Sequence, residues 1–156
     1  MVCASTGGAE LDGLEVAAHR TPEVSLKEVF LRATKGLPGP IDRRGEVVAE
    51  ALGYLQEGFG AHYATGVLTD DAILVGDHAY AWAVETIARL DEPRFVGVAS
   101  RMIRDGAGEI SRGSTVSIEL WTPHLSQLLS IISGEDEGRS KERIQGAIGE
   151  VEDAAR

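Results

Sequence analysis

Residues 72–90, AILVGDHAYAWAVETIARL, decide the fold of this 156-residue chain, because they predict one helix that is apolar almost all the way round. At 3.6 residues per turn, one stripe of this helix carries apolar side chains and a single carboxylate: Ile73, Asp77, Tyr80, Val84 and Ile87. The opposite side is no more polar and consists of Ala72, Val75, Ala79, Trp82 and Ala83. A helix with two apolar sides needs two surfaces that bury it, which indicates the centre of a helical domain or contact with a partner.

Two further helices are predicted before this segment. Ser25-x-x-Glu28 is a capping box that predicts a helix to about residue 35, and GLPGP at 36–40 ends it. Asp42 then caps a long helix to about residue 64, which Thr65-Gly66 ends. Glycines recur inside this long helix, and each costs up to about 1 kcal/mol against alanine. They indicate either close approach of a neighbouring helix or a kinked end near Gly58-x-Gly60.

Start signals also divide the rest of the chain into helices. The central helix is expected to begin near Thr69 or Asp70, and Pro93 in Asp91-Glu92-Pro93 is expected in the first turn of a helix to about residue 113. Thr122-Pro123 predicts the start of an apolar helix that ends at 133–134, and a last helix is expected over 140–154. The intervening TVSIELW at 115–121 alternates like a strand, but one isolated strand is not stable, so we expect it to be extended or helical.

These signals predict an all-α protein, with residues 1–156 forming a single helical domain of about six or seven helices. Residues 1–10 and 134–139 are the segments expected to be flexible. No internal repeat and no linker of the kind that separates domains is present in the sequence. The chain is long enough to bury a core of its own.

The composition argues against several classes of function. The formal net charge is -10 at pH 7, and no basic cluster is larger than Arg43-Arg44, so nucleic acid is not an expected partner. No stretch approaches the roughly 20 apolar residues that a spanning helix needs, and the first residues lack a signal pattern, so we expect a cytoplasmic protein without a membrane span. The one cysteine, Cys3, and four scattered histidines indicate neither a disulfide nor a metal site, and no bound cofactor is expected.

The central segment nevertheless resembles a known family. Ala72-Ile73-Leu74-Val75-Gly76-Asp77, the later Asp91-Glu92-Pro93 turn and Gly108-Glu109-Ile110 are similar to the middle of the trans-prenyl diphosphate synthases. In that family, A-x-L-x-G-D opens a long helix at the subunit interface and a G-E pair lies near the end of the next helix. The resemblance covers about 45 residues, from roughly Thr69 to Arg112, and implies a fold related to part of the isoprenoid synthase fold.

The chain departs from this family at the residues that hold the substrate. The synthases bind Mg²⁺ and substrate diphosphates between two Asp-Asp-x-x-Asp motifs, and neither motif occurs here. Asp70-Asp71 is followed by apolar residues, and its two acids are explained by helix capping, with half of a metal site completed by another chain as the alternative. The Lys-Thr pair that follows the G-E element in the family is also missing, and Glu109 with Arg112 is expected to form a surface ion pair.

The short length and the missing motifs together favour a specialised member of the family. The chain looks like the small, non-catalytic subunit of the heteromeric hexaprenyl and heptaprenyl diphosphate synthases. The resemblance implies that it is not catalytic alone, that a catalytic subunit supplies the aspartate-rich motifs and Mg²⁺, and that this chain helps set product chain length. The runner-up interpretation is a self-associating helical binding or scaffold protein, with a small hydrophobic ligand as a further option, and a homodimer explains the doubly apolar helix equally well.

The residues expected at the partner interface lie on or just before the central helix: Asp77, Tyr80, Trp82, Ala83, Phe59 and Tyr63. Aromatic side chains are frequent anchors of protein interfaces, although the same residues are also ordinary core filling. Asp77 requires a partner, because an unpaired carboxylate on an apolar stripe costs several kcal/mol or takes up a proton. Its expected partners are Arg101 or Arg104 on the next helix or backbone amides at a helix end, with a contact to a catalytic subunit as the alternative.

Overall fold

The computed structural model describes residues 24–35, 37, 42–63, 69–114 and 116–156. These residues contain six helices and no strand. The helices are α2 (Leu26–Thr34), α3 (Asp42–Tyr63), α4 (Asp70–Ala88), α5 (Pro93–Ser111), α6 (Ile118–Ser133) and α7 (Glu137–Ala154). The all-α prediction is therefore confirmed for this part of the chain. The expectation of flexibility at 1–10, Cys3 and the Thr65-Gly66 break lie outside the described residues, as does the 36–40 breaker apart from Leu37.

Three of the predicted helix starts are confirmed by the side chains that cap them. Ser25 Oγ accepts a hydrogen bond from the Glu28 amide at 3.2 Å, and Thr69 Oγ1 accepts one from the Ala72 amide at 3.1 Å. Glu92 caps α5 by accepting from the Arg94 amide at 3.3 Å, and Pro93 is the first residue of that helix, where its missing N–H costs nothing.

The start of α6 was predicted wrongly. The helix begins at Ile118, so Pro123 lies inside it rather than in its first turn, and part of the segment expected to be extended or helical is helical. Proline removes the N–H that would bond the carbonyl of Glu119, one turn earlier. Burial outweighs this loss, because Trp121, Leu125, Leu128 and Leu129 of the same helix are at most 1% exposed.

The last helix also begins earlier than expected. The Asp136 side chain accepts a hydrogen bond from the Arg139 amide at 2.9 Å and starts α7 at Glu137. Residues 137–139, which were expected to be flexible, therefore form the first turn of α7. Gly134 ends α6 in the left-handed conformation at φ +72°, as the predicted Ser133-Gly134 stop requires.

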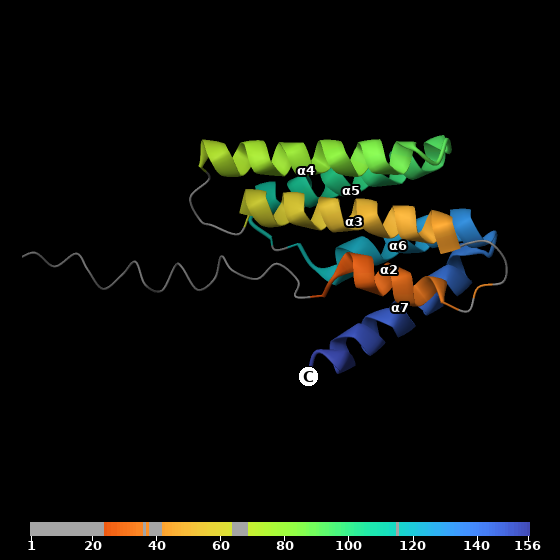
Figure 1. Cartoon of the computed structure of the whole chain (residues 1–156). Helices are drawn as coiled ribbons and strands as arrows, with labels where there is room; N and C mark the ends of the chain where they lie inside the picture. Colours follow the sequence, from red (N-terminus) through yellow and green to blue (C-terminus); the bar gives the residue numbers. More distant parts are fainter. Residues whose placement is uncertain (1–23, 36, 38–41, 64–68, 115) are drawn as a thin grey trace, which may run out of the picture.

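The helices form a closed cycle of neighbours (Figure 1). Each helix packs on the next one in the sequence, α7 packs back on α2, and α6 additionally contacts α2 and α3 across the cycle. The core fills the space between them with large side chains that are at most 1% exposed, among them Phe30, Leu52, Leu55, Phe95, Trp121 and Ile144. The helix α4 packs extensively on α3 and α5 and takes no part in the contacts across the cycle.

Burial along α4 corrects the expectation that this helix is buried on two sides. Its buried residues form one face of mostly small side chains: Gly76, Ala79, Ala83, Thr86 and Ile87. Small residues let neighbouring helices approach closely, so this face packs inward, while the stripe that contains Asp77 is buried only in part. The large apolar residues Leu74, Val75 and Trp82 remain on the outside of the chain.

Candidate docking surface

The inner face of α4 is joined to α3 by two aromatic rings that each lie on a glycine of the other helix. A Cβ atom at Gly58 would lie 2.4 Å from Tyr80 Cε1, and a Cβ atom at Gly76 would lie 2.0 Å from His62 Cδ2. Real Cβ atoms do not approach other atoms so closely, so the positions of Gly58 and Gly76 under these rings both require glycine. Of the two explanations offered for the glycines of α3, Gly58 therefore serves close helix approach, and the helix continues through it to Tyr63.

A third ring extends this contact from α3 towards α5 and α6. Phe59 lies edge-on to Tyr80, with 5.3 Å between ring centroids, and 4.8 Å from the ring of Trp121. The Phe59 ring also lies where a Cβ atom of Gly106 would be, at 2.5 Å from its Cε1. Four helices are thereby packed around one aromatic cluster, which fixes how α4 is held on the rest of the chain.

Asp77 is not a buried carboxylate, contrary to the sequence interpretation. Its side chain is 64% exposed, and its Oδ1 lies 3.4 Å from Nε2 of His62, which is also 3.1 Å from the carbonyl oxygen of Ile73. The expected arginine partners are engaged elsewhere: Arg101 donates to Gln127 and Arg104 donates to Asp105. The Gly76-Asp77 pair thus has a structural role, since Gly76 seats the His62 ring beside the Asp77 carboxylate.

The outer face of α4 is the main apolar surface of the described residues. Its large side chains Leu74, Val75 and Trp82 are 66%, 60% and 40% exposed. They line an open groove of about 550 Å³ between α3 and α4, which we call the α3/α4 groove: Tyr54, Glu57, Leu74, Val75, His78, Ala79 and Trp82. Contiguous exposed apolar side chains of this kind mark binding surfaces on soluble proteins.

The Trp82 ring is held in position by two neighbouring rings. Tyr54 stacks on it with centroids 6.2 Å apart at 29°, and His78 meets it edge-on at 5.8 Å. A tryptophan that is partly exposed and fixed by its neighbours is a typical anchor of a protein interface, because little side-chain entropy is lost when a partner covers it.

The structure separates the six residues expected at the interface. Trp82 lies on the outer face of α4, and Asp77 is exposed next to His62. Tyr80 is half-buried in the aromatic cluster, whereas Phe59 and Ala83 are 5% and 0% exposed and lie in the core of the chain itself. Tyr63 is the last residue of α3, and its side chain lies outside the described part of the chain.

Sequence reasoning missed the residues that build this surface most directly. Leu74 and Val75 were not among the residues predicted at the partner interface, and neither was Tyr54 on α3. The ring-on-glycine packing also carries a signal that could have been found, because Gly58–His62 and Gly76–Tyr80 have the same spacing of four residues. Residues four apart share one face of a helix, so a glycine and a ring in this pattern on two adjacent helices predict reciprocal packing.

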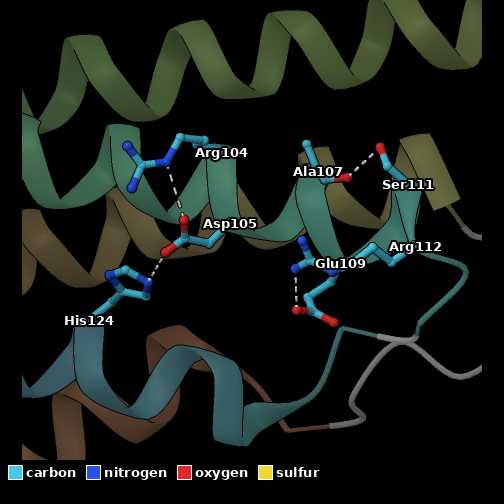
Figure 2. Close-up of polar contacts among 7 residues, drawn as sticks. All are labelled: Arg104, Asp105, Ala107, Glu109, Ser111, Arg112 and His124. Carbon is cyan, nitrogen blue, oxygen red and sulfur yellow. Dashed lines mark hydrogen bonds and ion pairs between the residues drawn. The ribbon is translucent and has the colours of Figure 1, made fainter.

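A second polar feature lies between α5 and α6 (Figure 2). Nε2 of His124 lies 2.9 Å from Oδ2 of Asp105, whose Oδ1 accepts from Arg104 Nε at 3.3 Å. The carboxylate can only accept, so the imidazole carries its proton on Nε2. Nδ1 of His124 is buried and has no hydrogen-bond partner among the described residues.

Figure 2 also shows the predicted Glu109–Arg112 ion pair, which is confirmed with 2.5 Å between Oε1 and Nη2.

Burial of His124 makes the stability of the chain depend on pH. Desolvation lowers the pKa of His124 below its ordinary value of 6.5. The negative charge of Asp105 raises this pKa, and the positive charges of Arg101 and Arg104 lower it, but desolvation is the largest effect. The unfolded chain therefore takes up a proton first as the pH falls through about 6.5, and the free energy of unfolding decreases until the pH reaches the pKa of the folded state. Thermal unfolding followed between about pH 7 and 5.5 should show this loss.

The variant His124→Gln tests this assignment. Glutamine keeps an N–H donor for Asp105 but does not titrate, so the decrease in stability over the same pH interval should become shallower. The other three histidines, His19, His62 and His78, are the same in both proteins. An unchanged pH dependence in the variant would show that proton uptake by His124 is not the cause.

Comparisons with protein families, with curated proteins and with solved structures found no match for this chain. Among the described residues, no group of three or more His, Cys, Asp or Glu side chains is placed to hold a metal ion. None of the helices in that part of the chain has the length and apolar character needed to cross a bilayer.

Proposed function

We propose that this chain is a non-catalytic accessory subunit of a heteromeric trans-prenyl diphosphate synthase. It docks on the catalytic subunit through the outer face of α4. The observation that carries the proposal is the exposure of Leu74, Val75 and Trp82 beside the α3/α4 groove. A partner that covered these side chains would bury the second apolar side of α4, as the sequence of this helix requires.

The positions of two short motifs support the link to the synthases. Gly76-Asp77 forms the seventh and eighth residues of the 19-residue helix α4, and Gly108-Glu109 lies in the last turn of α5. The resemblance implies this placement, with the first pair near the start of a long interface helix and the second near the end of the next helix. A relation to part of the isoprenoid synthase fold belongs to the same proposal.

The proposed division of labour follows from the residues that the chain lacks. The catalytic subunit contributes both aspartate-rich motifs, Mg²⁺ and the two diphosphate substrates. The present chain contributes a wall of the tunnel in which the growing prenyl chain lies, and so helps set the product length. This part of the proposal rests on the family resemblance.

The proposal is tested by reconstitution. The tagged chain is co-expressed with each protein of the same genome that carries two Asp-Asp-x-x-Asp motifs, and the purified material is assayed for Mg²⁺-dependent elongation of farnesyl diphosphate with isopentenyl diphosphate. We expect one such protein to co-purify and to elongate to a defined product length only in the complex. A stable, inactive homodimer that leaves every candidate subunit unbound would contradict the proposal and favour the scaffold interpretation.

The double variant Leu74→Ser/Trp82→Ala is expected to lose the complex without unfolding. Truncation of a tryptophan anchor at an interface commonly costs about 2 kcal/mol, or about 30-fold in Kd, and loss of the leucine adds to this. The Kd is measured by titration with the catalytic subunit, and the melting temperature by circular dichroism. Gln127→Ala, on the separate groove between α5 and α6, is the control and should bind normally. Wild-type affinity in the double variant would place the interface elsewhere.

A further inference from the structure

A second depression, between α2 and α3, adjoins the α3/α4 groove along α3. The second depression has a volume of about 510 Å³, shares Tyr54 and Glu57 with the first, and extends along the helix to Glu46. Eleven residues at 1.5 Å rise span about 16 Å, or three helical turns. The combined surface thus follows α3 lengthwise, with α2 beside the second depression and α4 beside the first. The α3/α4 groove itself has two adjacent helices as its walls, and a third helix packs well into a groove of this shape.

The charges around this surface are mostly negative. Glu46, Glu50 and Glu57 line the α3 side and are exposed. On α4, the exposed Asp71 and Glu85 lie one turn beyond the apolar residues at either end. Two cations oppose these five carboxylates: Lys27 lines the second depression, and Arg89 lies 3.7 Å from Glu85.

This charge pattern discriminates between three molecules or segments that could bind in the groove: a second copy of the chain, the chain's own residues 1–23, and a partner protein. A second copy of the chain would bring the same five carboxylates against them, and the whole chain already carries a net charge of -10. The chain's own residues 1–23 contain Glu10, Asp12, Glu15 and Glu23 against Arg20, so they are acidic as well. A partner with cationic side chains is the occupant that the electrostatics favour.

We infer that the α3/α4 groove binds an amphipathic helix of the partner whose apolar stripe is flanked by lysine and arginine. The apolar stripe lies against Leu74, Val75 and Trp82, and the flanking cations face the glutamates of α3. The inference rests on the proposed function for the existence of a partner helix, and it adds the chemistry by which that helix is recognised.

Two synthetic peptides test the inference without any synthase. Both are amphipathic helices of about 18 residues with the same leucine stripe, and their polar positions are all lysine in one and all glutamate in the other. Trp82 fluorescence reports binding, because the other tryptophan, Trp121, is only 1% exposed. We expect the lysine peptide to bind at least about tenfold more tightly than the glutamate peptide, and to weaken as NaCl rises from about 0.05 to about 0.5 M.

A charge reversal on α3, at Glu57 in the groove and at Glu50 in the adjoining depression, separates specific docking from attraction by net charge alone. Glu50→Lys/Glu57→Lys should weaken lysine-peptide binding at least about tenfold and improve binding of the glutamate peptide. The matched control Glu142→Lys/Asp153→Lys changes the net charge equally on α7, on the far side of α3 from α4 (Figure 1), and should leave both affinities within about twofold. Circular dichroism melts of all variants exclude unfolding as the cause.

Three results would overturn the inference. Equal effects of the two charge reversals would mean that net charge alone attracts the peptide, and equal binding of both peptides would mean that charge does not select the occupant. Binding that appears only after deletion of residues 1–23 would assign the groove to the chain's own segment. Failure of the elongation assay together with selective peptide binding would remove the synthase proposal and leave the cationic helix as the occupant.

Discussion

Replacement of Trp121 by alanine is expected to lower the free energy of unfolding by about 3–5 kcal/mol, which is a large share of the stability of a domain of this size. The Trp121 ring is 1% exposed and packs 4.8 Å from the ring of Phe59 and 6.2 Å from that of His124. Its removal opens a cavity in the middle of the aromatic cluster, where helices on several sides would have to collapse to fill it.

Urea denaturation followed by circular dichroism measures this effect, and Trp82→Ala is the matched control. Trp82 is 40% exposed and stacks on Tyr54 at the surface, so its truncation should cost less than about 1 kcal/mol. Equal losses for the two tryptophans would contradict the burial that the structure assigns to them.

The variant Gly106→Ala is expected to destabilise the chain by about 1–3 kcal/mol, even though alanine is the better helix former. The new Cβ atom would lie 2.5 Å from Phe59 Cε1 and 2.9 Å from Trp121 Cη2, and both rings are buried and cannot move aside cheaply. The steric cost therefore exceeds the gain in helix propensity of up to about 1 kcal/mol.

Gly146→Ala provides the opposite outcome on another helix. Gly146 is exposed on α7 and has no atom within 4 Å of the added Cβ, so only the propensity gain remains. Its melting temperature should rise while that of Gly106→Ala falls. A higher melting temperature in both variants would show that the Phe59 ring does not lie against Gly106 of α5.

Local signals in the sequence were sufficient for most of the helix boundaries. Ser25, Thr69 and Glu92 cap their helices through single hydrogen bonds within three residues, and such contacts are decided by the local sequence. Pro123 misled the prediction because its local preference for a first turn competes with the burial of Trp121 and the leucines that follow. That burial depends on helices distant in sequence, which a local pattern does not contain.

The candidate site was predicted in part. The doubly apolar pattern of residues 72–90 pointed to α4, and Trp82 lies on its outer face. The pattern did not reveal which side faces inward, because hydrophobicity favoured the stripe of Ile73 and Tyr80, whereas packing depends on the glycine and alanine positions that admit a neighbouring helix. For the same reason, Asp77 was assigned to the core, although it is exposed beside His62.

The His62 ring packs on Gly76 and the Tyr80 ring packs on Gly58, and these two contacts fix the register of α4 along α3. A shift by one residue would move each ring 1.5 Å along the partner helix and turn it away from its glycine, onto a position that carries a side chain. The outer residues of α4 are therefore presented at set spacings before any partner arrives. Binding to such a preorganised template requires little ordering of the chain, so the affinity of the complex should depend mainly on the surfaces that meet.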